Sequence, residues 1–128
     1  MKTGEYLAAT ADELAGHTAA DKAAGGVSQK ALFRRRGAIE LDGDSVVLRT
    51  WSDTHDLVLR REDVTTIRRE FTDLYGRFIG GLLDRGKPLI VDTRTAGEIY
   101  LLIDRKEFME TTDNKGWEKD LNAWRDAR

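Results

Sequence analysis

Short segments rich in β-branched and aromatic residues, separated by turn-forming residues, occupy most of the chain between residues 38 and 104. The first two segments, 38–41 and 46–51, flank an Asp-Gly pair in residues 42–44, which is a strong hairpin signal. Five further segments share this character: residues 56–60, 64–71, 74–79, 87–93 and 98–104. The pattern therefore predicts a mainly β fold of six or seven antiparallel strands at short intervals.

The last part of the chain has a helical pattern. Trp117, Leu121 and Trp124 lie at spacings of four and three residues, so they share one face of a helix. Asp113 or Asn114 is placed to cap its first turn. Tryptophans at this spacing are typical of a helix packed on a core, and we predict that they close the β structure.

Alanine dominates the first part of the chain, with eight alanines between residues 8 and 24. Alanine has the highest helix propensity, and the Gly-Gly pair at 25–26 is a strong helix stop. The apolar face of this segment carries too few large residues to form a core of its own. We therefore predict a helical or flexible arm over residues 1–26, dispensable for folding, and a single domain over residues 27–128.

This order of an arm, six or seven antiparallel strands and a terminal helix resembles the pleckstrin-homology-like (PH-like) domain, in particular its small bacterial members, many without an assigned role. The resemblance covers residues 31–127 and rests on segment 37–41, the turn at 42–44, segment 63–67 and the closing helix. It implies two nearly orthogonal antiparallel sheets that form a partly open barrel, capped by the C-terminal helix. The expected fold class is therefore mainly β (α+β).

Members of this family that bind phosphoinositide head groups typically place lysines and arginines in and beside the first hairpin loop. Here residues 42–44 form the predicted first hairpin turn, and Asp42 and Asp44 make it acidic. Because these carboxylates repel phosphates, we expect no saturable binding of inositol phosphates.

Composition excludes several kinds of chemistry. The chain contains no cysteine and two histidines, which rules out thiolate nucleophiles and makes a metal centre unexpected. No serine or threonine lies in a nucleophile motif, so we predict a non-enzymatic protein without a cofactor. A net charge of -2 gives no general attraction to nucleic acid. The longest apolar run, residues 99–103, is shorter than the roughly 20 residues of a membrane helix, and no signal pattern precedes it, so we expect a cytoplasmic protein.

Residues 34–36 form a run of three arginines, the sharpest charged cluster in the sequence. Arginine binds phosphate or carboxylate groups by bidentate hydrogen bonds. Successive side chains of a strand point to opposite faces, so Arg34 and Arg36 are the pair expected to act together. The alternative is a solvated strand edge whose charges block edge-to-edge pairing.

A second candidate is the glycine-containing stretch from residue 76 to 87, which combines apolar and basic side chains. Its candidate contact residues are Arg77, Phe78, Ile79, Leu82, Arg85 and Lys87. An apolar loop with basic flanks suits a peptide-binding edge or a loop that contacts membranes. Alternatively, residues 78–79 complete a barrel strand and the glycines at 80–81 only bend it.

These patterns favour a module that binds an unidentified protein or peptide through a sheet edge, the 76–87 stretch and the arginines. A peripheral module for anionic membranes that uses the same residues is the first alternative. A carrier of a small apolar ligand inside the barrel is the second, although three tryptophans and a closing helix favour a filled core. The sequence leaves formation of a homo-oligomer open.

Overall fold

The computed structural model describes residues 2–16, 33–72, 87–104 and 112–127. Its elements in chain order are β1 (Lys2–Thr10), α1 (Ala11–Ala15), β2 (Arg35–Asp42), β3 (Ser45–Leu48), β4 (Leu57–Arg60), the 3-10 turn η1 (Arg61–Asp63), β5 (Val64–Arg69), β6 (Leu89–Thr93), β7 (Gly97–Ile103) and α5 (Asn114–Asp126). The strand predicted over residues 74–79 lies outside the described residues.

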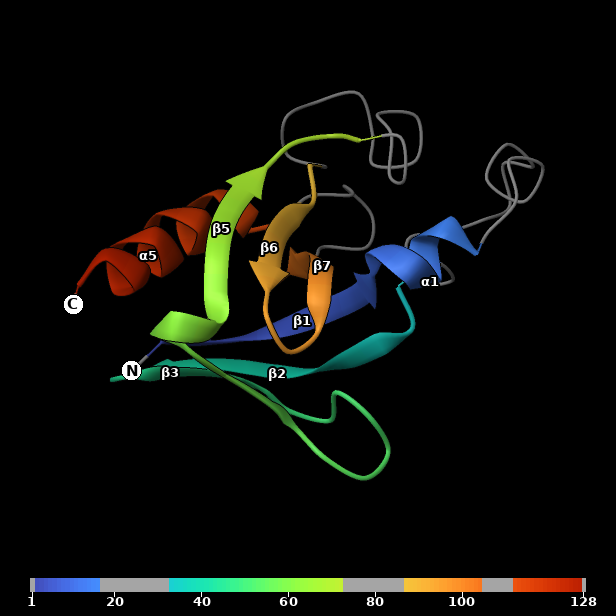
Figure 1. Cartoon of the computed structure of the whole chain (residues 1–128), viewed down its shortest axis with the longest axis horizontal. Helices are drawn as coiled ribbons and strands as arrows, with labels where there is room; N and C mark the ends of the chain where they lie inside the picture. The colour runs from blue at the N-terminus through green and yellow to red at the C-terminus, as the bar shows by residue number, and fades with distance from the viewer. Residues whose placement is uncertain (1, 17–32, 73–86, 105–111, 128) are drawn as a thin grey trace.

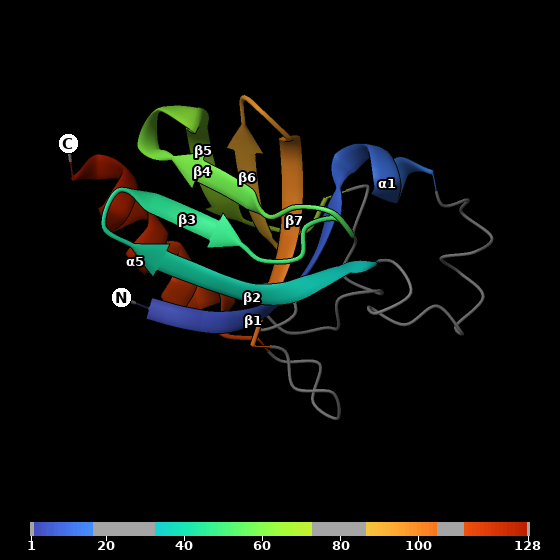
Figure 2. The same cartoon turned by 90° about the horizontal axis from the view of Figure 1, so that it is seen from below.

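The seven strands of the described residues form one antiparallel sheet in the order β4-β3-β2-β1-β7-β6-β5. Strands β1 and β2 run across the direction of β5 and β6, so the sheet curls into a half-barrel (Figures 1 and 2). Helix α5 lies beside β5 and packs on β5, β6 and β7. The predictions of a mainly β antiparallel fold and of a C-terminal helix are confirmed.

The N-terminal segment differs from the prediction. Residues 2–10 form strand β1, which occupies the centre of the sheet and pairs with both β2 and β7. A helix begins only at Ala11, where the Thr10 hydroxyl accepts a hydrogen bond from the Glu13 amide and Glu13 in turn accepts one from the Thr10 amide. The prediction of a helical arm outside the domain is therefore wrong for the β1 segment, which is part of the sheet.

Burial explains why an alanine-rich segment forms a strand. Tyr6 and Ala8 face the concave core, whereas Ala9 faces a second apolar cluster on the opposite side of the sheet. A strand buried on both faces carries apolar residues without alternation, so its sequence is easily taken for that of a helix. Pairing on both of its edges outweighs the helix propensity of alanine. The hinge predicted at residues 25–26 lies outside the described residues.

Two apolar clusters stabilise the sheet from its two sides. The larger cluster lies between the concave face and α5 and includes Trp51, Trp117 and Trp124. The smaller one lies on the outer face, where Leu14 of α1 and Phe33 pack against residues of β1, β6 and β7. The space enclosed by the larger cluster is about 10 Å³, enough for about one water molecule. Side chains therefore fill the interior of the half-barrel.

Asn114, expected only as a capping residue, is a buried polar anchor. Its Oδ1 accepts a hydrogen bond from the Ile103 amide (2.8 Å), and its Nδ2 donates to the carbonyls of Leu101 (3.0 Å) and Lys87 (2.8 Å). These bonds tie the first turn of α5 to the end of β7 and to the segment before β6. Asp113 occupies the N-cap position without a side-chain capping bond.

Replacing Asn114 with alanine is expected to lower the free energy of unfolding by about 3 kcal/mol, because it removes three hydrogen bonds to the backbone, two of them buried. Urea denaturation followed by tryptophan fluorescence measures this loss. Asn122→Ala is the matched control, since among the described residues the Asn122 amide donates within its own helix, to the Glu118 carbonyl. Equal losses for the two variants would contradict the anchoring role of Asn114.

Candidate functional site

An open cleft of about 490 Å³ lies at the start of β2, and we refer to it as the arginine cleft. Its lining comes from α1, from Arg34 and the first two residues of β2, and from the loop between β3 and β4. The lining residues are Glu13, Arg34, Arg35, Arg36, Thr50, Trp51, Ser52 and Asp53. The cleft thus brings the predicted pair Arg34 and Arg36 together with side chains that are distant in the sequence.

Arg35 is held in place by its surroundings. Its Nε donates to Glu13 Oε1 at 2.9 Å, and its Nη1 donates to the Trp51 carbonyl at 2.7 Å. The guanidinium carbon lies 4.6 Å from the centroid of the Trp51 ring, a cation–π distance. Arg35 therefore joins α1 and the β3–β4 loop to β2, and Glu13 balances its charge.

Arg34 and Arg36 are exposed, and neither forms an ion pair within the described part of the chain. Alternation along the extended backbone places both side chains opposite Arg35. The cleft contains three arginines and two carboxylates, Glu13 and Asp53, which leaves one excess positive charge. Because Arg35 is paired with Glu13, the positive charge available to a ligand in the cleft is that of Arg34 and Arg36.

The loop between β3 and β4 is held by Asp56. Its carboxylate accepts hydrogen bonds from the Thr50 amide (2.7 Å) and from Arg49 Nη1 (2.9 Å). These two bonds, the amide bond first, lower the pKa of Asp56 below its usual value of 3.8. Thr50 has a left-handed backbone conformation (φ 58°), which the bond to Asp56 stabilises. The wall of the arginine cleft is thus formed before any ligand binds.

Ser52 and His55 in the same loop lie at the distance of a nucleophile and its base, with His55 Nδ1 2.8 Å from Ser52 Oγ. Ser52 Oγ also accepts hydrogen bonds from the amides of Thr54 and His55, as in an ordinary serine turn. Thr54 Oγ1 contacts the same ring nitrogen at 3.0 Å. We therefore interpret the contact between Ser52 and His55 as part of the hydrogen bonding that stabilises the turn. In the described residues, no group of three or more His, Cys, Asp or Glu side chains is arranged to hold a metal ion.

The acidic turn at residues 42–44 connects β2 and β3, with Gly43 at a positive φ of 56°. It is not the first hairpin of the fold, because β1 precedes β2 and the first connection runs from residue 11 to 34. The turn and the arginine cleft lie at opposite ends of β2, about 25 Å apart for eight extended residues. Asp44 there pairs with Arg61 at 2.7 Å. The carboxylates of this turn therefore lie away from the arginine cleft.

Five of the predicted contact residues lie outside the described residues: Arg77, Phe78, Ile79, Leu82 and Arg85. Lys87 is described, and it lies just before β6, where its carbonyl accepts the bond from Asn114. Its side chain does not line the arginine cleft. The structure therefore brings together Arg34 and Arg36 but does not add Lys87 to them.

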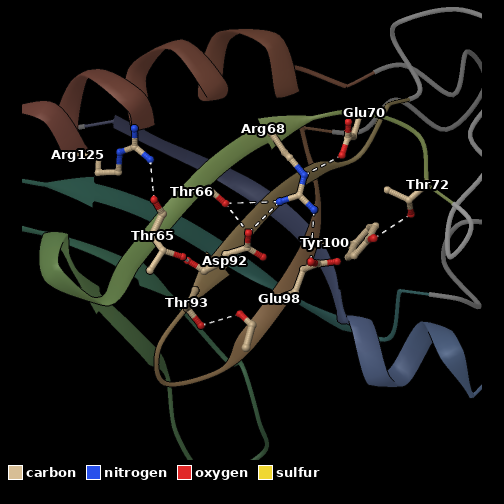
Figure 3. Close-up of polar contacts among 11 residues, drawn as sticks. Thr65, Thr66, Arg68, Glu70, Thr72, Asp92, Thr93, Glu98, Tyr100 and Arg125 are labelled. Carbon is tan, nitrogen blue, oxygen red and sulfur yellow. Dashed lines mark hydrogen bonds and ion pairs between the residues drawn. The ribbon is translucent and has the colours of Figure 1, made fainter.

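A second polar cluster, centred on Arg68, lies on the outer face of β5, β6 and β7 and was not expected from the sequence (Figure 3). Arg68 forms ion pairs with Glu70 (2.8 Å), Asp92 (2.9 Å) and Glu98 (3.3 Å). Asp92 and Glu98 oppose each other across β6 and β7, so Arg68 offsets a like-charge pair. Thr66 donates a further hydrogen bond to Asp92. Only the strand register brings these residues together, which is why no local pattern predicts them.

The Arg68 cluster is a connection between strands rather than a reactive site. Burial alone raises the pKa of Asp92, but hydrogen bonds and charge from Thr66 and Arg68 outweigh it and keep that pKa below its usual value of 3.8. The hydrogen bond to Glu70 is the largest effect that raises the pKa of Arg68. Each of the three carboxylates is bound to the same guanidinium, and we therefore assign the cluster a structural role.

Glu13 gives the arginine cleft a defined pH dependence. Burial raises its pKa, but hydrogen bonds from Thr10 and Arg35 outweigh burial and lower the pKa below its usual value of 4.5. The ionised form therefore stabilises the fold above pH 4.5, and this contribution is lost as the pH falls through the folded-state pKa. Glu13→Gln keeps the cap but loses the charge, so it is expected to lower the melting temperature at neutral pH.

Thermal unfolding of both proteins across the acidic range tests this effect. The two melting curves are expected to converge once the pH is low enough to protonate Glu13 in the folded wild type. A difference that stays constant with pH would show that the Arg35–Glu13 ion pair contributes nothing to stability.

Comparison of the chain with protein-family models, with curated proteins and with solved structures gave no match. Among the described residues, none of the helices combines the length and the apolar composition needed to cross a membrane. The functional argument therefore starts from the arginine cleft itself.

Proposed function

We propose that this chain is a non-enzymatic binding module that holds an acidic segment of a partner protein in the arginine cleft. The observation that carries the proposal is the arrangement of the three arginines. Arg35 is fixed by Glu13 and Trp51, while Arg34 and Arg36 point to the opposite face of the strand and have no ion pairs in the described residues. Exposed guanidinium groups bind carboxylates by paired hydrogen bonds, and a rigid base lowers the entropic cost of binding.

The arrangement of the strands supports a PH-like architecture as part of this proposal. A meander of β1 to β4, a second one of β5 to β7 and a closing helix α5 are in keeping with that family, although pairing of β1 with β7 joins the two meanders into one curled sheet rather than two separate sheets. In such a fold the arginine cleft belongs to the end of the half-barrel at which α1, the start of β2 and the β3–β4 loop meet. Loops at one end of a β scaffold are a common place for binding sites.

The geometry argues against a carrier of small apolar ligands, because the enclosed space of about 10 Å³ is far smaller than a typical ligand site of about 300–1,000 Å³. An inositol phosphate carries several negative charges and requires several cations around one pocket. The cleft offers Arg34 and Arg36 as free cations, and Asp53 opposes them. We therefore keep the prediction that inositol phosphates do not bind saturably, now on the basis of the cleft rather than the 42–44 turn.

Fluorescence anisotropy with a labelled peptide of about ten glutamates, in about 0.15 M salt, tests the proposal. We expect saturable binding that Arg34→Glu combined with Arg36→Glu weakens at least tenfold. Arg94→Glu is the matched control, since Arg94 is exposed in the β6–β7 turn, outside the cleft, and this change is expected to alter the affinity less than twofold.

Two parallel measurements separate the alternatives. Sedimentation with phosphatidylserine vesicles and calorimetry with inositol hexakisphosphate use the same three proteins. Micromolar one-to-one binding of the inositol phosphate, or vesicle binding without peptide binding, would replace the proposal by a membrane-binding function. Equal weakening of peptide binding by Arg94→Glu would also overturn it, because binding would then depend on general charge.

A further inference from the structure

Strand β4 is a border of the sheet, and its outward backbone groups at Val58 have no partner among the described residues. The Arg60 amide donates to Asp63 Oδ2 at 3.0 Å rather than to Ser45, its register partner on β3. Hydrogen bonding alternates along an antiparallel strand, so Val58, two residues earlier, also turns its N–H and C=O away from β3. The edge that faces outward is therefore centred on Val58.

The other border of the sheet is covered. Helix α5 packs on β5, and Arg125 Nη1 donates to the Thr65 carbonyl at 2.9 Å. By contrast, the Val58 side chain on β4 is 51% exposed. Among the described residues, no other large apolar side chain is classed as exposed. Uncovered edge strands readily pair with another chain. In Figure 2, β4 is the strand next to β3 at the end of the β1–β3 series.

The sequence of this edge is complementary to itself. Residues 56–60 read Asp-Leu-Val-Leu-Arg. When two copies align antiparallel about Val58, each Leu57 faces a Leu59, and each Asp56 faces an Arg60. Val58 then faces Val58 of the second copy. The two residues form a hydrogen-bonded pair, because the outward N–H of each donates to the outward C=O of the other. Opposite charges at both ends favour this register. Leu59 is buried in the core of its own chain, so the exposed Val58 supplies the apolar contact between the copies.

We propose that two copies of this chain associate through β4, antiparallel and about a two-fold axis at Val58, into one continuous sheet. The interface is isologous, so the same short strand supplies both sides. A hollow of about 710 Å³ lies along this edge, lined by Asp44, Ser45, Val58, Arg60, Arg61 and Glu62, and it leaves room beside the partner strand. The contact is short, and association in the micromolar range is therefore expected.

Sedimentation equilibrium of the full chain between about 1 and 500 µM tests the dimer. The wild type is expected to shift from monomer to dimer over this range. Val58→Lys places two ammonium groups opposite each other and Arg60→Glu places carboxylates opposite Asp56, so each is expected to weaken association at least tenfold. Thr95→Lys, exposed in the β6–β7 turn, is the control and is expected to leave association unchanged.

Cross-linking tests the register, because the chain has no cysteine of its own. The Cα atoms of a hydrogen-bonded antiparallel pair are about 5.5 Å apart, within the range that a disulfide spans. Val58→Cys is therefore expected to form a covalent dimer under mild oxidation much faster than Thr95→Cys. A wild type that stays monomeric throughout, a dimer that survives Val58→Lys, or equal rates for the two cysteine variants would overturn the proposal. The Arg34→Glu and Arg36→Glu protein serves as a further check, since loss of peptide binding there must leave the dimer intact.

Discussion

A chain that lacks residues 1–10 is expected to be unfolded under conditions in which the full chain is folded. Strand β1 pairs with β2 at seven residues and with β7 at five, so its removal separates the sheet into β2–β4 and β5–β7. The core also loses Tyr6 and Ala8, which are almost completely buried. A domain of this size is stable by about 5–15 kcal/mol, and the loss of a central strand is of at least that order.

Circular dichroism and amide NMR spectra of the truncated chain measure this effect, with loss of the cooperative transition and of chemical-shift dispersion as the expected result. Adding a peptide of residues 1–16 in excess is expected to restore part of the folded signal, because the peptide supplies the missing strand. Thr3→Ala, on the exposed side of β1, is expected to melt as the wild type does. A truncated chain that melted within a few degrees of the full chain would instead agree with a dispensable arm.

Trp117→Ala is expected to leave most of the chain unfolded at about 37 °C. Trp117 is completely buried, its Nε1 donates to Asp104 Oδ2 at 3.4 Å, and Lys2 Nζ lies 4.7 Å from its ring centroid. The ring also fills the space over Gly4, where a Cβ would lie 3.1 Å from Trp117 Cζ2. Truncating such a side chain costs about 3–5 kcal/mol, a large part of the total stability.

Chemical denaturation of the Trp117 variant beside Lys119→Ala tests the prediction, because Lys119 lies on the exposed side of the same helix. Trp124 gives a graded comparison. Its indole nitrogen is buried and has no hydrogen-bond partner in the described residues, so Trp124→Phe is expected to cost less than Trp124→Ala. A wild-type denaturation midpoint for Trp117→Ala would show that α5 does not hold the half-barrel together.

The strands from residue 35 onward and the terminal helix were predictable because their signals are local. The β2–β3 hairpin follows from an Asp-Gly pair between β-rich segments, and the buried face of α5 follows from the spacing of Trp117, Leu121 and Trp124. The alternation of Arg34 and Arg36 about Arg35 is also a property of extended chain alone. In each case the deciding interactions lie within a few residues of one another.

Strand β1 was missed because its partners are distant in the sequence. Ala8 pairs with Arg35 on one side and with Leu101 on the other, and burial on both faces removes the alternation that marks a strand. One local signal was present, since Thr10 and Glu13 have the spacing of a capping box, which places the start of a helix after residue 10. Helix propensity alone could not place that boundary, because tertiary pairing outweighs it.

The sequence by itself determined which arginines share a face, but only the tertiary structure decided which of them are free. Arg35 is paired because the β1–α1 boundary brings Glu13 to it and the β3–β4 loop brings the Trp51 ring and carbonyl. In the same way, Arg68 meets Asp92 and Glu98 only through the register of β5, β6 and β7. Charge pairing depends on distances of a few ångströms, and contacts between remote segments set those distances.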